Sequence, residues 1–207
     1  MSAMDGLIVT TNMGIMTKLK RIADIRAGYT YRETPKPMPG SGILMLQIRD
    51  MRDSQIIDIE ALQEIKWEGK QSQVLKQGEV VIAARGIHNT AALLQVNKTD
   101  KKVIPSNQLL VLTPRKNILP EYLCWVLNYP KTQQQLDEMR TGTNIPSINK
   151  KHLEELSIPL PEMEVQKQII RLYQLRQKEK ALVETLEINR DTLINGIYQK
   201  LLKECTK

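Results

Sequence analysis

The sequence predicts an α+β fold, in which a β-rich globular region is followed by a long C-terminal helix with coiled-coil character. Three observations predict it: short aliphatic runs recur in the first half of the chain, helix signals begin at Pro120, and no Pro occurs from Glu162 to Lys203. We divide the chain into an N-terminal extension at 1–16, a globular domain at 17–160 and a helix at 161–207.

Five segments of four to seven residues are rich in aliphatic side chains and bounded by turn or charged residues, as is typical of strands. They lie at 43–48, 56–59, 79–84, 91–96 and 108–112. Before them, the spacing of apolar residues between Lys18 and Gly28 indicates a short helix or turn. The Pro-rich segment 34–42 is predicted to be a loop.

Three short helices follow the strands. Pro120 suits the first position of a helix, where its missing N–H is not needed, and Leu123, Val126 and Leu127 form one apolar face. Tyr129-Pro130 ends this helix, and a second is predicted at 131–139. The polar loop 141–147 leads to a third helix at 149–156.

From Glu162 to Lys203 the chain is rich in Lys, Glu, Gln and Leu, and its apolar residues recur at intervals of seven. One heptad position holds Val165, Leu172, Leu186 and Leu193, the other holds Ile169, Val183 and Ile197, and Leu175 and Leu182 flank them. Arg176, Glu179 and Arg190 interrupt the series. Because no other helix of similar length is predicted, this helix is expected to pair with another chain.

The composition restricts the class of protein. The 207 residues carry a net charge of +7, and this basic balance is consistent with a nucleic-acid partner. The absence of Phe disfavours aromatic platforms for single strands. Cys124 and Cys205 form no disulfide framework, Cys124 is predicted to lie in the core, and we expect a cytoplasmic protein without signal peptide or membrane span.

Catalytic and metal-binding motifs are lacking, and His88 and His152 have no paired ligand pattern. One short pattern, Asp58 followed by Glu64-Ile65-Lys66, resembles the metal-binding arrangement of many nucleases. The pattern is short and matches many chains by chance, so a charged hairpin edge is the preferred explanation. A metal-dependent DNA nuclease is therefore kept as an alternative function, but no catalytic and no metal-binding residue is assigned.

Six elements occur in a specific order. They are Gly78-Glu79-Val80-Val81-Ile82-Ala83-Ala84-Arg85-Gly86, a strand at 108–112, Leu119-Pro120-Glu121-Tyr122-Leu123, the loop and helix Gly142-Thr143-Asn144-Ile145-Pro146-Ser147-Ile148-Asn149-Lys150-Lys151-His152-Leu153, Ile158-Pro159-Leu160-Pro161, and Glu164-Val165-Gln166-Lys167-Gln168-Ile169. This order resembles the specificity subunits of type I restriction-modification systems. Asn149-Lys150 stands where that family usually has Ser-Lys.

The resemblance implies that 17–160 is a target-recognition domain for double-stranded DNA and that the chain is not an enzyme. It implies a methyltransferase subunit and a restriction/translocase subunit as partners. S-adenosylmethionine, ATP and Mg²⁺ would belong to those partners, so no cofactor is expected here. Family members usually carry two recognition domains and two long helices, so we interpret this chain as a half-length form. It would form a homodimer or pair with another half subunit through its helix, without membrane contact.

Base reading requires polar side chains on loops, and backbone contact requires positive charge. The candidate DNA-binding residues are Arg26, Tyr29, Tyr31, Arg32, Gln47, Arg49, Arg85, His88, Asn89, Thr143, Asn144, Lys150 and Lys151. The candidate dimerisation residues are Val165, Ile169, Leu172, Val183, Leu186, Leu193 and Ile197. A coiled-coil scaffold without DNA affinity is the second alternative function.

Overall fold

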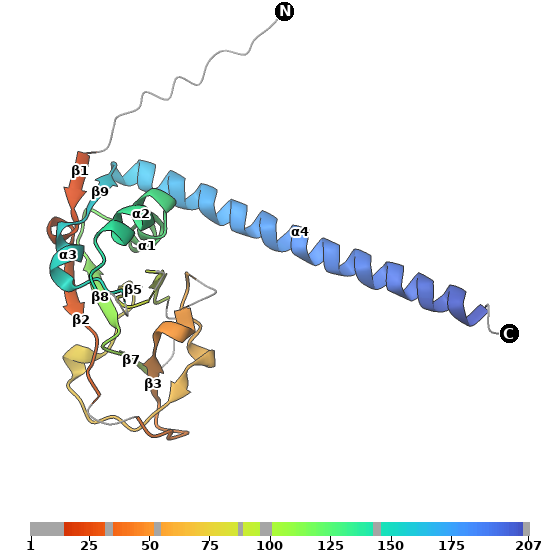
Figure 1. Ribbon diagram of the computed structural model, residues 1–207, viewed down its shortest axis with the longest axis horizontal. Coiled ribbons are helices and arrows are strands. Elements are labelled where there is room, and N and C mark those ends of the chain that lie inside the picture. Colours follow the sequence, from red (N-terminus) through yellow and green to blue (C-terminus); the bar gives the residue numbers. More distant parts are fainter. Residues whose placement is uncertain are drawn as a thin grey trace, which may run out of the picture. The chain divides into compact units, whose positions relative to one another are not determined.

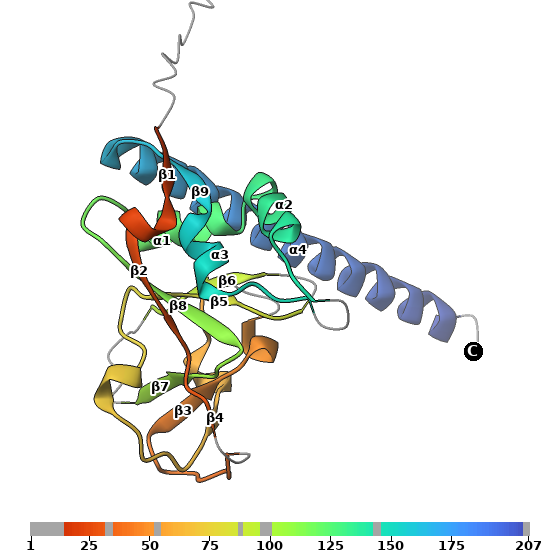
Figure 2. The same ribbon diagram turned by 60° about the vertical axis from the view of Figure 1, so that its left-hand side comes forward.

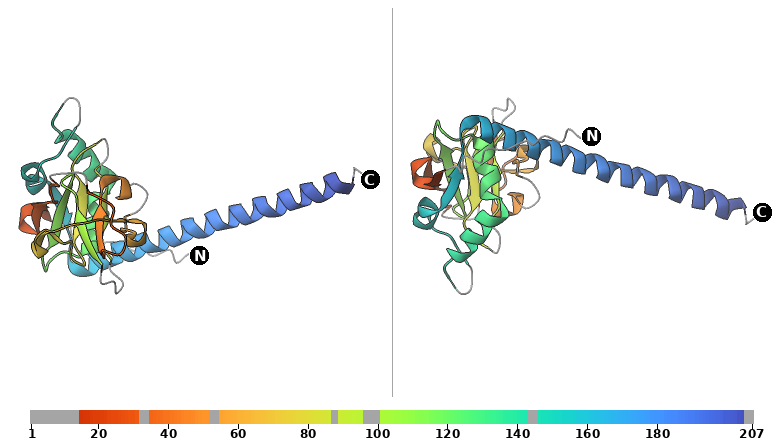
Figure 3. Two further views of the ribbon diagram at one scale, coloured as in Figure 1. Left: turned by 90° about the horizontal axis from the view of Figure 1, so that it is seen from below. Right: turned by 90° about the horizontal axis from the view of Figure 1, so that it is seen from above.

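The computed structural model describes residues 15–31, 35–51, 55–86, 89–95, 101–142 and 146–204. The chain divides into two compact units, one up to Gln166 and one from Lys167 onward. The first unit contains strands β1 to β9 and helices α1 to α3 (Figures 1 and 2). Most of helix α4, Met163–Glu204, belongs to the second (Figure 3).

The largest sheet of the first unit has four antiparallel strands in the order β2-β8-β5-β6. Their bounds are Ala23–Ala27, Leu109–Pro114, Val80–Ala83 and Ala91–Leu93. All four residues of β5 are buried, which explains its uninterrupted aliphatic sequence. Val81 and Val111 point into the main hydrophobic core, and the α1 helix contacts β5 and β6.

A second sheet has three strands in the order β4-β3-β7, with bounds Gln63–Glu64, Ile43–Leu46 and Lys102–Pro105. Strand β3 runs antiparallel to β4 and parallel to β7. Leu44, Leu46 and Val103 from this sheet join Val81 and Val111 in one core. The apolar faces of the two sheets therefore bury each other.

The three predicted helices of the first unit are present, with α2 beginning one residue before its predicted start and α3 one residue after it. Helices α1, Pro120–Leu127, and α2, Pro130–Glu138, each start with Pro at the first position. In α3, Lys150–Glu155, the side-chain oxygen of Asn149 accepts a hydrogen bond from the backbone N–H of His152. In α1, Cys124 is buried, as the sequence predicts, and this burial raises the pKa of its thiol to about 12.

Strands β1, Ile15–Lys18, and β9, Ser157–Leu160, form a two-stranded antiparallel sheet. Lys18 and Lys20, on or beside β1, both donate to the carboxylate of Glu155 in α3, each at 2.5 Å. These hydrogen bonds lower the pKa of Glu155 to about 2. The polar contacts therefore join the beginning and the end of the globular unit.

Several predictions of secondary structure are wrong. Residues 18–28 form a single 3₁₀ turn, Leu19–Arg21, followed by strand β2, because pairing with β8 favours extended backbone. Residues 56–59 make one bridge at Ile56 and then a 3₁₀ turn at Ile59–Ala61. Ile15 and Met16 belong to β1, so the extension predicted at 1–16 is too long. Two short 3₁₀ turns, Ile48–Met51 and Gln71–Gln73, were not predicted.

Candidate nucleic-acid interface

Two predicted loop regions far apart in sequence lie side by side. The backbone N–H of Gly86 donates to Pro146 O at 3.0 Å, and that of Ile148 donates to Ala84 O at 2.8 Å. Arg85 and Thr141 each form a β-bridge with Ser147. We call residues 84–86, 141–142 and 146–148 the Arg85 loop cluster. Gly86 and Gly142 have φ of 101° and 99°, which residues with a side chain rarely adopt.

The Arg85 loop cluster presents positive charge beside the start of a helix. Arg85 is exposed, and no ion pair involves it among the described residues. After one intervening residue, Lys150 and Lys151 lie in the first turn of α3, and both are exposed. Lys150 lies 3.5 Å from Glu154 in a half-exposed pair, a contact that water and salt weaken.

A second group of candidates surrounds the end of β7. The N–H of Tyr29 donates to Pro105 O at 2.7 Å, and on the other side Ser106 N–H donates to Leu46 O at 2.9 Å. This places Tyr29 and Gln47 on opposite sides of residues 105–106. Gly28 makes the approach possible, because a Cβ there would lie 2.0 Å from Ser106 O.

Tyr29 and Tyr31 form an aromatic cluster with Trp67, a residue absent from the predicted set. The Tyr29 ring lies 4.8 Å from Tyr31 and 6.0 Å from Trp67, both edge-to-face. Burial, with a smaller effect from Tyr29, raises the pKa of Tyr31. Among the residues that the structure describes, none forms a hydrogen bond with the buried Tyr31 hydroxyl or with Trp67 Nε1. Arg49 remains exposed, with Asp50 at 3.7 Å.

Arg26, one of the predicted DNA-binding residues, is engaged in internal contacts. Its guanidinium donates to the Glu79 carboxylate at 2.9 Å and to Val74 O at 3.3 Å. Glu79 is buried and also accepts from Lys76 N–H and the Thr113 hydroxyl, at 2.8 and 2.6 Å. Arg26 therefore neutralises a buried carboxylate that joins β2, β8 and the turn before β5.

The structure contradicts the expectation that Asn89 lies on a loop surface. Its side chain is fully buried, its Nδ2 donates to Ala83 O at 2.6 Å, and its Oδ1 accepts from Arg140 Nε at 2.9 Å. Gln133 donates to the Asn89 carbonyl at 3.0 Å. Asn89 therefore links the end of β5 to α2, and burial makes its side-chain amide inaccessible to a base. Four further candidates, Arg32, His88, Thr143 and Asn144, lie outside the described residues.

The predicted apolar series on α4 is accessible. Leu172, Leu186 and Leu193 are 70, 56 and 65% exposed, and Val165, Val183 and Ile197 are exposed as well, whereas Ile169 is half-buried. Gln166, at the start of α4, is fully buried, although the sequence assigns it no role. Gln166 accepts from Leu119 N–H at 2.9 Å and donates to the carbonyls of Asn117 and Pro161 at 3.1 and 2.9 Å.

The nuclease-like pattern does not converge on one site. Asp58 accepts from the backbone N–H of Glu60, Glu64 accepts from that of Gly40 and pairs with Lys101 at 3.6 Å, and Lys66 pairs with Glu68 at 3.1 Å. In the described part of the chain, no group of three or more His, Cys, Asp or Glu could hold a metal ion. None of its helices is long and apolar enough to span a bilayer.

Solved structures with a similar fold come from restriction systems. One, described as "Structural basis underlying complex assembly and conformational transition of the type I R-M system", aligns with TM-score 0.62 and 22% identity over 83% of this chain and 40% of its own. The HsdS subunit from Thermoanaerobacter tengcongensis aligns with TM-score 0.60 and 21% identity over 84% and 40%.

The S subunit of a type I system from M. genitalium has TM-score 0.54 and 16% identity over 89% of this chain and 45% of its own. This chain thus spans less than half the length of these structures. Among curated proteins, none matches. The family model described as "Type I restriction modification DNA specificity domain" matches residues 16–189, most of the chain. By that match, the chain belongs to the type I restriction-modification DNA specificity domain family.

Proposed function

We propose that this chain reads the sequence of double-stranded DNA as the specificity component of a type I restriction-modification complex. The Arg85 loop cluster carries the proposal, because it joins an exposed guanidinium from the end of β5 to the exposed lysines of the first turn of α3. An arginine matches the paired acceptors of guanine, whereas lysines near a helix start suit phosphates. The cluster therefore combines base reading with positioning on the backbone.

The backbone around Arg85 supports this role. Arg85 lies two residues after the end of the buried strand β5. Its neighbours on both sides are hydrogen-bonded, Ala84 N–H to Gln108 O at 2.9 Å and Gly86 N–H to Pro146 O at 3.0 Å. A base-reading side chain must be held on a rigid backbone, since a small displacement loses a bidentate contact. The aromatic cluster and Gln47 form a second surface that could contact the same duplex.

Helix α4 has the separate role of pairing with a second long helix. Its exposed apolar series would remain in water unless another helix covered it. Two chains paired in this way would hold one recognition domain at each end of the helix pair and would read a bipartite site. The methyltransferase and restriction/translocase subunits would dock on this assembly and supply S-adenosylmethionine, ATP and Mg²⁺ chemistry.

The test is selection of duplexes from a random pool by the purified chain, followed by affinity measurements at several salt concentrations. We expect enrichment of one sequence and a steep fall in affinity with salt. Arg85→Ala should relax the preference at one base pair, at a cost of about 1–3 kcal/mol. Replacing Lys150 and Lys151 by Ala should weaken binding to all sequences and reduce the salt slope by about 1 per phosphate contact.

Lys116→Ala is the matched control, because Lys116 is exposed and lies beyond the opposite end of β8 from Gln108. It should bind as the wild type does. Two outcomes would overturn the proposal. Absence of any salt-dependent binding to duplex DNA would favour a scaffold, and cleavage of plasmid by the pure chain with Mg²⁺ would favour a nuclease.

A further inference from the structure

One buried side chain, Asn89, holds the returning end of the connection between β5 and β6. Its Nδ2 donates to the carbonyl of Ala83, the last residue of β5, at 2.6 Å, and the backbone N–H of Ala83 donates to Thr90 O at 3.0 Å. Its Oδ1 accepts from Arg140 Nε at 2.9 Å. The connection is therefore attached both to β5 and to the residue that follows α2, close to the Arg85 loop cluster.

An amide side chain suits both of these contacts. A guanidinium can only donate hydrogen bonds and a main-chain carbonyl can only accept them, so the group between them must accept on one side and donate on the other. Asn89 does so with its two amide atoms, and its side chain is fully buried. Because the two partners differ in this way, the amide has one orientation that satisfies both.

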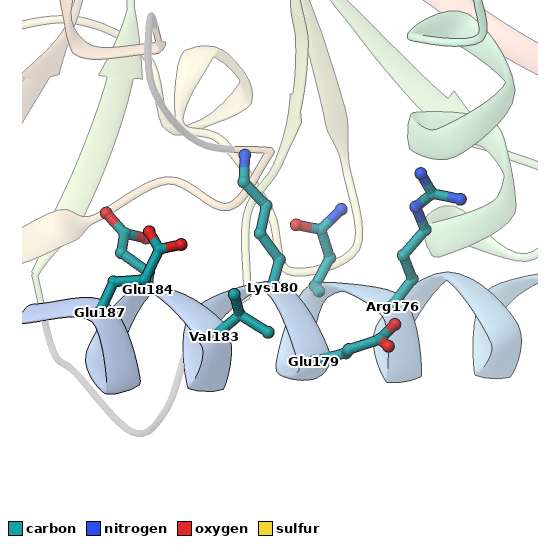
Figure 4. A pocket seen from close by; sticks show the side chains of 7 residues that line it. Arg176, Glu179, Lys180, Val183, Glu184 and Glu187 are labelled. Atoms are coloured by element: carbon teal, nitrogen blue, oxygen red, sulfur yellow. The ribbon is translucent and has the colours of Figure 1, made fainter. Parts of the chain in front are cut away.

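The guanidinium of Arg140 is itself nearly enclosed. Its side chain is 13% exposed, and besides donating to Asn89 it lies 2.5 Å from the Asp137 carboxylate, which neutralises its charge. Arg176 on α4 shows the contrasting case, because it lines a shallow depression with Glu179 where both side chains are exposed (Figure 4). Water competes for the donors of an exposed guanidinium, whereas an enclosed one keeps its partners.

Arg140 directly precedes a segment of the Arg85 loop cluster. The next residue, Thr141, exchanges two backbone hydrogen bonds with Ser147, at 3.0 and 2.9 Å, and Ser147 also forms a β-bridge with Arg85. The contact between Arg140 and Asn89 thus joins the two chain segments whose relative position places Arg85. Without it, the backbone pairs of the cluster remain, but the cluster loses its fixed orientation relative to the end of α2.

We propose that Arg140 and Asn89 are positioning residues, which set the base-pair preference of the Arg85 guanidinium without contacting DNA themselves. The inference rests on the proposed function in taking Arg85 as a base-reading residue, and it adds the residues that determine how well Arg85 discriminates. A bidentate contact needs its donors held within about 0.5 Å of the productive geometry. A small rotation of the cluster therefore weakens base reading and leaves phosphate contacts intact.

Arg140→Met in the full chain tests the proposal, because it removes the donor and keeps most of the side-chain length. Affinities are measured for the duplex that the wild type selects and for a duplex changed at the base pair whose preference Arg85→Ala relaxes. A bidentate contact discriminates between bases about 5- to 150-fold, and Arg140→Met should remove most of that ratio. Asn89→Asp should act in the same way, because a carboxylate cannot donate to Ala83 O.

Lys131→Met is the matched control, since Lys131 is exposed on α2 and the substitution also removes one positive charge. This variant should keep the full discrimination. In the double variant Arg85→Ala/Arg140→Met, discrimination at this base pair should equal that of Arg85→Ala alone. Arg140→Lys keeps the charge and one donor group, so it should recover part of the ratio, and it is the second variant should circular dichroism show that Arg140→Met does not fold.

Three results overturn the inference. Full discrimination by Arg140→Met at wild-type affinity excludes a positioning role. An equal loss of discrimination in the presence and in the absence of the Arg85 guanidinium shows that the effect does not pass through that residue. A uniform fall in affinity for all duplexes, with a smaller salt slope, identifies Arg140 as a phosphate contact instead.

Hydrogen exchange in the protein without DNA separates this inference from the proposed function. In Arg140→Met the N–H groups of Gly86 and Ser147 should exchange faster than in the wild type, whereas that of Leu123 in α1 should not. Unchanged exchange overturns the positioning role, whatever the DNA measurements give. A wild type that selects no DNA sequence removes the proposed function, whereas one that selects a sequence beside a fully discriminating Arg140→Met removes only the positioning role.

Discussion

Gln166→Ala should destabilise the globular unit far more than an ordinary exposed substitution on a helix. The side chain is fully buried, its oxygen accepts from Leu119 N–H at 2.9 Å, and its nitrogen donates to Asn117 O and Pro161 O at 3.1 and 2.9 Å. It therefore joins the loop before α1 to the segment between β9 and α4. Removing it leaves three main-chain polar groups without this partner.

The expected loss follows from how well those groups can be rehydrated. Asn117 is exposed, so water can reach its carbonyl, whereas the half-buried N–H of Leu119 would lose its acceptor. Net hydrogen bonds contribute about 1 kcal/mol each and a buried unpaired donor costs about 1–3 kcal/mol, so we expect a loss of about 2–3 kcal/mol. With a urea slope of about 2 kcal/mol/M, the unfolding midpoint should fall by about 1–1.5 M.

The assay is urea unfolding followed by tryptophan fluorescence, because both tryptophans, Trp67 and Trp125, lie in the globular unit. Gln168→Ala is the matched control, since Gln168 is exposed on the same helix two residues away. Gln166→Glu should also destabilise, because its carboxylate would face two carbonyl oxygens. Equal midpoints for Gln166→Ala and Gln168→Ala would refute the reasoning.

Three further predictions concern other parts of the globular unit. Burial, with a smaller effect of Glu121, raises the pKa of Cys124 to about 12, so its thiol should resist alkylation at pH 8 in the native state and react in urea. Mass spectrometry of the labelled peptide checks this, and fast labelling of the native protein would contradict it. Lysine hydrogen bonds lower the pKa of Glu155 to about 2, so the stabilisation by this carboxylate should be complete above pH 4.5, its ordinary value, and lost as the pH falls toward 2. Wild type and Glu155→Gln should therefore differ in unfolding midpoint at pH 6 and converge near pH 2; a constant difference would argue against the contact. Gly28→Ala should prevent or severely weaken folding, since the new Cβ would lie 2.0 Å from a main-chain oxygen, whereas Gly196→Ala, with open space around it on α4, should stabilise the helix by about 1 kcal/mol by thermal unfolding.

Sequence reasoning located the elements whose signals are local. The helix start at Pro120 depends on the missing N–H of proline, and the strand at Val80–Ala83 depends on a short aliphatic run, so neighbouring residues suffice to predict them. The sequence analysis predicts no strand at β9, Ser157–Leu160, a segment that contains Pro159. In the structure that proline is exposed and lies in a two-stranded sheet, where a missing N–H is tolerated.

The candidate interface was predicted less completely, because the role of a polar residue depends on partners distant in sequence. Arg26 and Arg85 look equally available in the sequence, yet Arg26 pairs with buried Glu79, 53 residues later, whereas Arg85 stays exposed. The side chain of Asn89, which was predicted to lie on a loop, forms hydrogen bonds with Ala83 O and Arg140 Nε inside the globular unit. No local signal distinguishes these cases.

By itself the sequence determined the α+β class, the long helix with its apolar series and charged interruptions, and the order of motifs that resembles the specificity family. Each of these follows from periodicity and short-range spacing. Only the tertiary structure decided that β3 pairs in parallel with β7, that the buried Gln166 side chain hydrogen-bonds to Leu119 N–H, and that Arg85 forms a β-bridge with Ser147. These depend on which segments meet when two sheets bury a common core. Chain packing sets such contacts, and it assigns polar side chains either to internal hydrogen bonds or to the surface.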